Sequence, residues 1–179
     1  MPGSIANDVR AKIIAAAAHV VRQRGLTDWT VESVAKRAGC AKGLVLYHFG
    51  TKAAVLTELA SRVRLERLER RIDALSVGGA AGLDQLWQVL VSEAEDGTTG
   101  LWLGLIAAEG SRIAASIEEP DRARFSAAAV AAMQLGLDFE GGSDLLDALN
   151  GFELALLQGR PAELVREGFD RYWLDLLSA

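Results

Sequence analysis

The chain contains few of the residues that interrupt or cross-link a fold: one cysteine, Cys40, and three prolines among 179 residues. A single cysteine excludes an internal disulfide, and scarce proline favours a folded, mostly helical protein. No apolar run approaches the roughly 20 residues of a membrane span. The first twelve residues also lack the apolar core of a secretory signal. These absences predict a soluble, cytoplasmic protein that does not enter a membrane.

Familiar catalytic motifs are also missing. The chain has no Ser-His-Asp set, no HExxH pair and no glycine-rich phosphate loop. Its two histidines, His19 and His48, fall in different predicted helices, with Cys40 nearby. An all-helical enzyme that uses these residues is an alternative, and loss of turnover on replacing Cys40 or His48 would support it. We expect no catalytic residues, no cofactor and no metal site.

Charge is distributed unevenly along the chain. Residues 1–52 hold eight basic and three acidic side chains, a formal charge of +5, whereas the whole chain carries −5, which leaves −10 for residues 53–179. A small basic head on an acidic body is typical of a protein whose head binds a polyanion. The alternative is a chance fluctuation of surface charge.

Helical periodicity dominates, and strand signals are nearly absent. We expect an all-α protein of about nine helices, with a three-helix head over residues 1–52 and a helical body over residues 53–179. Asn7 is a candidate N-cap, and Pro120 and Pro161 lie where helices can begin. The predicted helices cover about residues 8–23, 31–38, 42–49, 52–75, 83–95, 99–116, 121–137, 144–158 and 162–177, with a loop at 76–82 and breaks at 138–143 and 158–161.

The most informative segment is TVESVAKRAGCAKGLVLYHFGTK, at residues 30–52. Thr30 can cap one short helix, and Gly39 can adopt the positive φ that a tight turn into the next helix needs. Ala35 is small enough to let the two helices cross closely, and Val45 points back into the head. Two short helices joined in this way form a helix-turn-helix, whose second helix lies in the DNA major groove.

The surface of the second of these helices suits nucleic acid. A lysine at its start can reach a phosphate or a guanine edge, the next glycine permits close approach, and a leucine can press on a thymine methyl. A tyrosine hydroxyl and an imidazole offer hydrogen bonds to phosphates or bases, and a lysine opens the following helix. Each residue alone is an ordinary surface residue, but the ordered set predicts DNA contact. The residues are Lys42, Gly43, Leu44, Tyr47, His48 and Lys52.

This run of residues resembles the TetR (tetracycline-repressor) family of bacterial transcription regulators. The resemblance rests on Thr30, on VAKRAGCAKG at 34–43, on LYHF at 46–49 and on Thr51-Lys52 with Ala54-Val55-Leu56 behind, about the first third of the chain. It implies that DNA is contacted by the threonine that opens the second helix, by the third helix and by the lysine that opens the fourth. By position these are Thr30, Lys42, Leu44, Tyr47, His48 and Lys52.

Three positions depart from the family pattern. Ala41 stands where a serine cap is common, Leu46 where an aromatic is common, and Cys40 where an aliphatic residue is usual. Without a capping side chain at Ala41, one phosphate contact is missing as well. These departures do not change the expected fold, but they leave the operator sequence open.

One head reads only a few base pairs, so specific binding usually comes from a two-fold dimer. The last two predicted helices carry small and apolar side chains at helical spacing, and C2 homodimers are the commonest oligomers. In the TetR family, two such helices from each subunit form a four-helix interface. The alternative is that these faces fill the core of one chain. The predicted interface residues are Ala148, Leu149, Gly151, Phe152, Ala155, Leu156, Phe169, Tyr172, Trp173 and Leu176.

The central helices can hold a ligand cavity. One helical stripe carries Trp102, Ile106, Glu109 and Ile113, and a carboxylate on an apolar stripe is costly to bury without a partner. Glu109 can therefore face a cationic or hydrogen-bonding ligand. The alternative is an ordinary core stripe with Glu109 at its edge. The predicted ligand-binding residues are Trp87, Trp102, Ile106, Glu109, Phe125 and Met133.

These patterns and the resemblance together predict a homodimeric transcription repressor, with a helix-turn-helix DNA-binding domain over residues 1–52 and a ligand-binding and dimerisation domain over residues 53–179. It binds a palindromic double-stranded operator, and a small, largely apolar effector releases it. The resemblance implies that the long fourth helix carries the movement. An effector-independent DNA-binding regulator and an activator are the alternatives, and neither the operator nor the effector can be read from the sequence.

Overall fold

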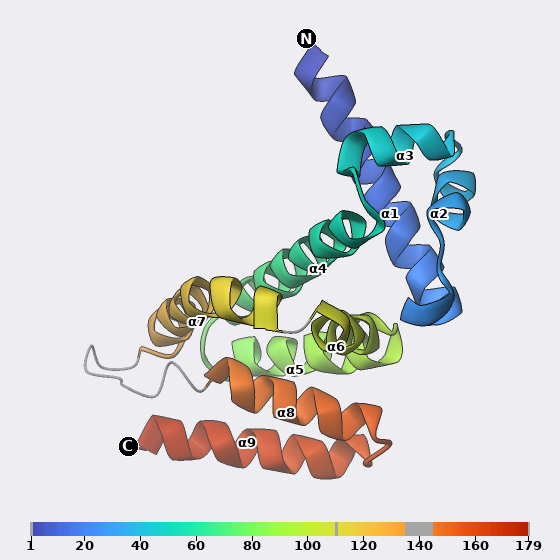
Figure 1. The fold of residues 1–179 in the computed structure, drawn as a ribbon. Coiled ribbons are helices and arrows are strands. Elements are labelled where there is room, and N and C mark those ends of the chain that lie inside the picture. Colours follow the sequence, from blue (N-terminus) through green and yellow to red (C-terminus); the bar gives the residue numbers. More distant parts are fainter. Residues whose placement is uncertain (1, 110, 135–144, 179) are drawn as a thin grey trace. The chain divides into compact units, whose positions relative to one another are not determined.

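The computed structural model describes residues 2–109, 111–134 and 145–178. Throughout these ranges the regular structure is helical, without strands, which confirms the all-α prediction. Three predicted helices have their expected bounds, and the last two differ by no more than one residue at either end (Figure 1). The helices are α1 (Pro2–Asp28), α2 (Val31–Ala38), α3 (Lys42–Phe49), α4 (Lys52–Leu75), α5 (Gly79–Glu95), α6 (Thr98–Glu109), α7 (Ser111–Met133), α8 (Leu145–Leu157) and α9 (Ala162–Ser178).

The first helix is longer than predicted. α1 begins at Pro2 rather than near residue 8, so Asn7 lies inside the helix and is not its N-cap. Proline suits the first helical position because its φ is fixed and it has no N–H to satisfy. Gly25 adopts a φ of 78°, the positive value expected of a turn, and a last helical segment follows it as far as Asp28.

The loop predicted at residues 76–82 is shorter, because α5 already begins at Gly79. Gly82 is a buried helical residue rather than a loop residue. A Cβ at this position would lie 3.0 Å from the carbonyl oxygen of Leu75. Glycine therefore lets the first turn of α5 pack closely against the end of α4.

The predicted helix start at Pro120 is wrong. α6 ends at Glu109 and α7 begins at Ser111, so Pro120 lies inside α7. A proline removes a single intrahelical hydrogen bond, and a helix with several turns on both sides can continue through it at a cost of about 3 kcal/mol. The predicted break at 138–143 lies outside the described residues, whereas the one at 158–161 is confirmed.

The chain forms two compact units. Unit 1 contains residues 1–64 and 101–113, and unit 2 contains residues 65–100 and 114–179. The core of unit 1 packs α1 to α4 through side chains that are at most 1% exposed, among them Ile13, Ala17, Val34, Val45 and Leu59. The domain boundary predicted between residues 52 and 53 stays a prediction.

The core of unit 2 is built by helices that are distant in sequence. Fully buried side chains come from α4, α5, α7, α8 and α9, and they include Leu75, Leu90, Phe125, Leu149 and Phe169. α8 packs against α5 and also lies beside α9 (Figure 1). The C-terminal helix pair is thereby held against the remainder of this unit.

A candidate nucleic-acid interface

The turn between α2 and α3 has the geometry that the sequence predicts. The Thr30 hydroxyl accepts a hydrogen bond from the Ser33 amide at 3.1 Å, and the Ser33 side chain in return accepts one from the Thr30 amide. Gly39 ends α2 in the left-handed region, at φ 67° and ψ 38°. The Cys40 amide then donates to the Ala35 carbonyl at 3.0 Å. Reciprocal capping and a left-handed glycine fix the direction in which α3 leaves the turn.

The two faces of α3 differ sharply. Val45 is completely buried and Phe49 is 8% exposed, so one face packs into the core. On the other face Tyr47 is 83% exposed and Leu44 is 37% exposed. A Cβ placed on Gly43 would meet nothing within 4 Å, so nothing within the described chain requires glycine there. The outer face of α3 is therefore open to a partner that approaches the backbone closely.

Arg10 of α1 fixes the C-terminal end of this helix. One guanidinium nitrogen donates to the His48 carbonyl at 2.6 Å, and another pairs with Glu58 of α4 at 3.1 Å. The same guanidinium lies 4.5 Å from the centre of the Phe49 ring. A cation at a helix C-terminus is favourable because it compensates the exposed carbonyls. Sequence reasoning missed Arg10, because its partners lie 38 and 48 residues away.

The start of α4 presents another exposed cation. Thr51 caps α4 as predicted, since its hydroxyl accepts from the Ala54 amide at 3.0 Å. The Lys52 ammonium lies 4.6 Å from the centre of the buried Trp29 ring. A cation–π contact restricts the lysine without neutralising its charge. His48 is half-buried, and its ring makes an edge contact with Tyr47 at 5.3 Å between centroids.

Lys42, at the start of α3, is already paired within the chain. Its ammonium bonds to the Glu32 carboxylate, in the first turn of α2. The hydrogen bond from Lys42 holds the pKa of Glu32 below its ordinary value. Both side chains are more than half exposed, at 52% for Lys42 and 60% for Glu32. As expected from the sequence, Ala41 leaves α3 without a side-chain cap.

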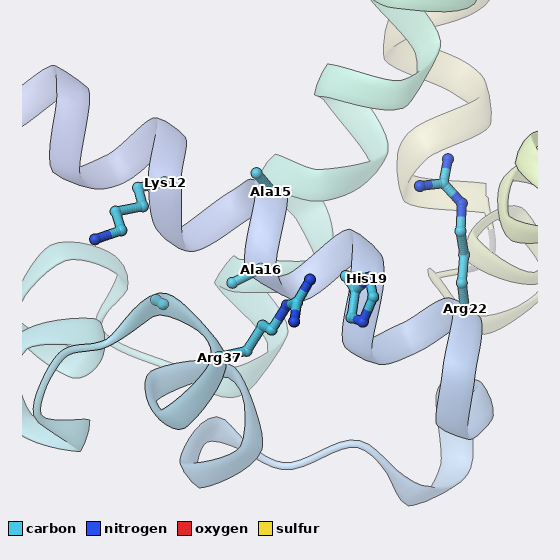
Figure 2. A pocket seen from close by; sticks show the side chains of 7 residues that line it. Lys12, Ala15, Ala16, His19, Arg22 and Arg37 are labelled. Atoms are coloured by element: carbon cyan, nitrogen blue, oxygen red, sulfur yellow. The ribbon is translucent and has the colours of Figure 1, made fainter.

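A basic hollow lies between α1 and α2. It has a volume of about 390 Å³, and Arg37 of α2 extends along it toward the α1 residues Ala16 and His19 (Figure 2). Lys12 lies further toward the start of α1, and the Arg22 side chain leaves α1 in a different direction from Arg37. The hollow extends the positive surface of the head but does not focus its cations on one point. Its lining residues are Lys12, Ala15, Ala16, His19, Arg22, Arg37 and Ala38.

The residues predicted to bind a ligand lie in both compact units. In unit 2, Trp87 is 6% exposed and Phe125 is completely buried, both within the hydrophobic core, and Met133 packs against that core. In unit 1, Trp102 and Ile106 on α6 are half-buried. The Glu109 side chain lies outside the described part of the structure. A pocket formed by these six residues stays a prediction.

The structure divides the predicted dimer residues into two groups. Leu149, Phe169 and Trp173 are at most 1% exposed within a single chain, so they fill the core of unit 2 and offer no surface to a second copy. This buried group corrects the sequence-based set, because only an exposed side chain can meet a partner. The other predicted residues, Ala148, Gly151, Phe152, Ala155, Leu156, Tyr172 and Leu176, are exposed or half-buried.

Sequence reasoning missed five exposed leucines on α8 and α9. They are between 39% and 63% exposed, whereas most large apolar residues of unit 2 are buried. Each exposed leucine side chain leaves apolar area in water, which costs free energy unless a partner covers it. The i, i+3 spacing of the pairs 154/157 and 174/177 was the available signal. The residues are Leu154, Leu157, Leu164, Leu174 and Leu177.

Unit 2 also contains a buried quartet of charges, defined as Arg67 and Arg71 of α4, Glu93 of α5 and Glu153 of α8. Each side chain is at most 5% exposed. Glu153 accepts hydrogen bonds from both arginines, including one from Arg71 at 2.6 Å. Glu93 accepts from Arg67 at 3.0 Å and from Arg71 at 3.4 Å. The quartet is balanced in charge and joins three helices.

The two carboxylates of the quartet differ in their pKa values. Burial raises the pKa of Glu93 above its ordinary value, although Arg71 and Arg67 act against this. Burial also acts to raise the pKa of Glu153, but Arg71 and Arg67 outweigh it and the pKa lies below its ordinary value. Glu153 is therefore the more firmly ionised of the two.

The fold and the exposed α3 face define an all-α protein with a helix-turn-helix. The family described as "Bacterial regulatory proteins, tetR family" matches residues 13–59, which span most of α1, all of α2 and α3 and the start of α4. This match agrees with the TetR resemblance over the helix-turn-helix and the helices on either side of it. No helix in the described ranges is long and apolar enough to cross a membrane.

Two curated relatives both come from Pseudomonas putida: the HTH-type transcriptional regulator SrpR and the uncharacterized HTH-type transcriptional regulator TtgW. Each is 33% identical over 87 residues, or 48% of this chain. The matched segments make up 38% of SrpR and 60% of TtgW, so the chain spans less than two thirds of either relative.

Solved structures match over more of the chain. The multidrug binding protein EbrR, complexed with imidazole, is 27% identical, with a TM-score of 0.64 over 90% of this chain and 88% of that one. A TetR family transcription regulator from Marinobacter aquaeolei VT8 is 16% identical, with a TM-score of 0.67 over 98% of both chains. The second likeness concerns the fold alone.

Proposed function

We propose that the protein is a transcription regulator that binds duplex DNA through the outer face of α3. The observation that carries this proposal is the contrast on that helix, where Val45 is completely buried and Tyr47 is 83% exposed. The Tyr47 side chain lies outside the core, so its hydroxyl can reach a phosphate or a base edge. The contacts in each head come from Thr30, Lys42, Gly43, Leu44, Tyr47, His48 and Lys52.

The regulator acts as a homodimer that binds a palindromic operator in the cytoplasm. The exposed leucines of α8 and α9 support this, since a second copy related by a two-fold axis covers the same surface on both chains. The same two helices carry half-buried residues of the predicted interface, such as Ala148 and Leu156. Two heads held by one interface can reach successive turns of the same DNA face.

The regulator is a repressor, and a small, largely apolar effector releases it. The match of residues 13–59 to the TetR family and the likeness to a multidrug binding protein support an effector site in the body. Release requires the effector to bind the off-DNA conformation more tightly, and a coupling of about 1–3 kcal/mol changes operator affinity roughly 5- to 150-fold. The predicted site residues are Trp87, Trp102, Ile106, Glu109, Phe125 and Met133.

An effector-independent regulator is the second candidate, and one observation favours it. Trp87 and Phe125, two of the predicted ligand-binding residues, are closely packed in the core of unit 2. A filled core leaves these side chains no room to bind a molecule unless the core opens. Thermal-shift screening of a library of metabolites and antibiotics separates the two candidates, because only an effector-binding protein gains stability from a library member.

The DNA-binding proposal is tested by selection from a genomic duplex library with the full-length protein, followed by mobility-shift titration. We expect a recovered site with two related half-sites and an affinity that falls as salt increases. Recovery of no site with salt-sensitive binding would overturn the proposal. Addition of the stabilising compounds to the same titration then shows whether they release the protein.

A further inference from the structure

The ion pair between Glu32 and Lys42 lies on the same surface as the proposed DNA contacts. Glu32 is in the first turn of α2, just after Thr30, and Lys42 is the first residue of α3. Their side chains bond to each other although both are largely exposed, at 60% and 52%. The pair therefore sits at the meeting point of the two helices of the helix-turn-helix, where both members remain accessible.

A carboxylate is an unexpected group on a surface that binds a polyanion. Glu32 is repelled by phosphates, and while it holds Lys42 the two side chains contribute no net charge to phosphate binding. If this surface only neutralised the DNA backbone, Glu32 would simply weaken binding. A carboxylate is favourable in the major groove only opposite a hydrogen-bond donor, and the N4 amino group of cytosine is such a donor.

We propose that Glu32 determines operator specificity, and this inference rests on the proposed DNA-binding function. Glu32 and Lys42 act together as an acceptor and a donor held side by side. A G·C base pair offers the complementary groups, because guanine presents acceptors at O6 and N7 and cytosine presents a donor at N4. Lys42 donates to the guanine and Glu32 accepts from the cytosine, once in each half-site.

This arrangement discriminates by penalising the wrong base pair. When an A·T pair places thymine where the cytosine was, the O4 acceptor replaces the N4 amino donor, so Glu32 faces another acceptor while it stays near the phosphates. A good base contact of this kind discriminates roughly 5- to 150-fold against the wrong base. Glu32 also lowers affinity for non-specific DNA, where backbone contacts dominate. Specificity is thus gained at the expense of general affinity.

The test uses the full-length protein, a duplex library and the variants Glu32→Ala and Glu32→Gln. The matched control is Asp28→Asn, which removes another exposed carboxylate of the head. After selection, fluorescence anisotropy compares the recovered duplex, the same duplex with the proposed G·C pair changed to A·T, and a duplex of unrelated sequence. Circular dichroism melting checks that each variant is folded.

We expect the wild type and Asp28→Asn to prefer G·C at one position in each half-site by about 5- to 150-fold. In Glu32→Ala and Glu32→Gln this preference falls to about threefold or less, and the unrelated duplex binds more tightly than it does to the wild type. Unchanged preference in both Glu32 variants overturns the inference while the proposed function stands. An equal loss of affinity for all three duplexes also overturns the inference, because a purely structural role of Glu32 would produce that result. Failure of the wild type to bind any duplex overturns both.

Discussion

Replacing Glu153 by glutamine should destabilise the protein strongly, although it changes the shape of the side chain very little. Glu153 is 1% exposed and accepts hydrogen bonds from Arg67 and Arg71, each of which is also buried. The substitution leaves two buried guanidinium groups opposite one buried carboxylate, Glu93. Because the site excludes water, the surplus positive charge cannot be solvated.

The size of the expected loss in stability follows from the charge balance of the buried quartet. Removing one partner of a buried ion pair costs about 3–5 kcal/mol, because the remaining charge is uncompensated. That is a large fraction of the roughly 5–15 kcal/mol by which a domain is stable. In a chain of this size, each kcal/mol lowers the melting temperature by about 2–4 °C. We therefore expect Glu153→Gln to melt about 6–20 °C below the wild type.

Circular dichroism melting and urea titration of the full-length protein measure this effect. Glu167→Gln, on the exposed side of α9, is the control and should change stability by no more than about 0.5 kcal/mol. The double variant Glu153→Gln/Arg71→Met restores the charge balance. It should therefore be less destabilised than the sum of its two single variants. A loss below about 1 kcal/mol in Glu153→Gln would refute the reasoning.

Glu153 should also make the stability of the fold depend on pH, in a direction that its pKa determines. The pKa of Glu153 lies below its ordinary value of 4.5 in the folded state. Its ionic stabilisation is therefore fully present above pH 4.5 and is lost as the pH falls through the lower, folded pKa. The stability difference between wild type and Glu153→Gln should be large at pH 7 and should shrink below pH 4.5. A difference that is constant with pH would contradict this assignment.

Further predictions concern the head and the interface. Tyr47→Ala should weaken operator binding by about 1–3 kcal/mol in anisotropy titrations and leave the melting temperature unchanged, because the side chain is 83% exposed. Leu174→Glu should convert a dimer into a monomer in light scattering. Val77→Glu, in the exposed turn between α4 and α5 and away from the predicted interface helices, should not. Arg10→Met should lower operator affinity without removing any group that touches DNA, because α3 loses its anchor; an affinity equal to wild type would refute this positioning role.

The head could be predicted in detail because its signals are local. Thr30 and Thr51 cap helices, and Gly39 takes the left-handed turn, so the bounds of α2, α3 and α4 follow from residues within a few positions of each end. The alternation of buried and exposed positions on α3 follows from helical spacing alone. Arg10 could not be placed in the same way, because its partners come from two other helices.

The body was predicted less well because its decisive contacts join distant residues. Arg67 and Arg71, four residues apart, have the pattern of a solvated charged face. Glu93 is on the same helical stripe as Leu86 and Leu90, and all three are completely buried. An acidic residue on an apolar stripe suggested a ligand at Glu109, yet the structure shows that arginines from another helix can satisfy such a group.

The central claim is that two copies of the α3 outer face bind one duplex. The most direct measurement is fluorescence anisotropy of a selected operator duplex, titrated with full-length protein between about 50 and 200 mM salt. If Lys52 of each head contacts at least one phosphate, a plot of the logarithm of the binding constant against the logarithm of the salt concentration should have a slope near −2 or steeper. The stoichiometry should be two chains per duplex. A slope near zero, or saturation by a single chain, would contradict the account.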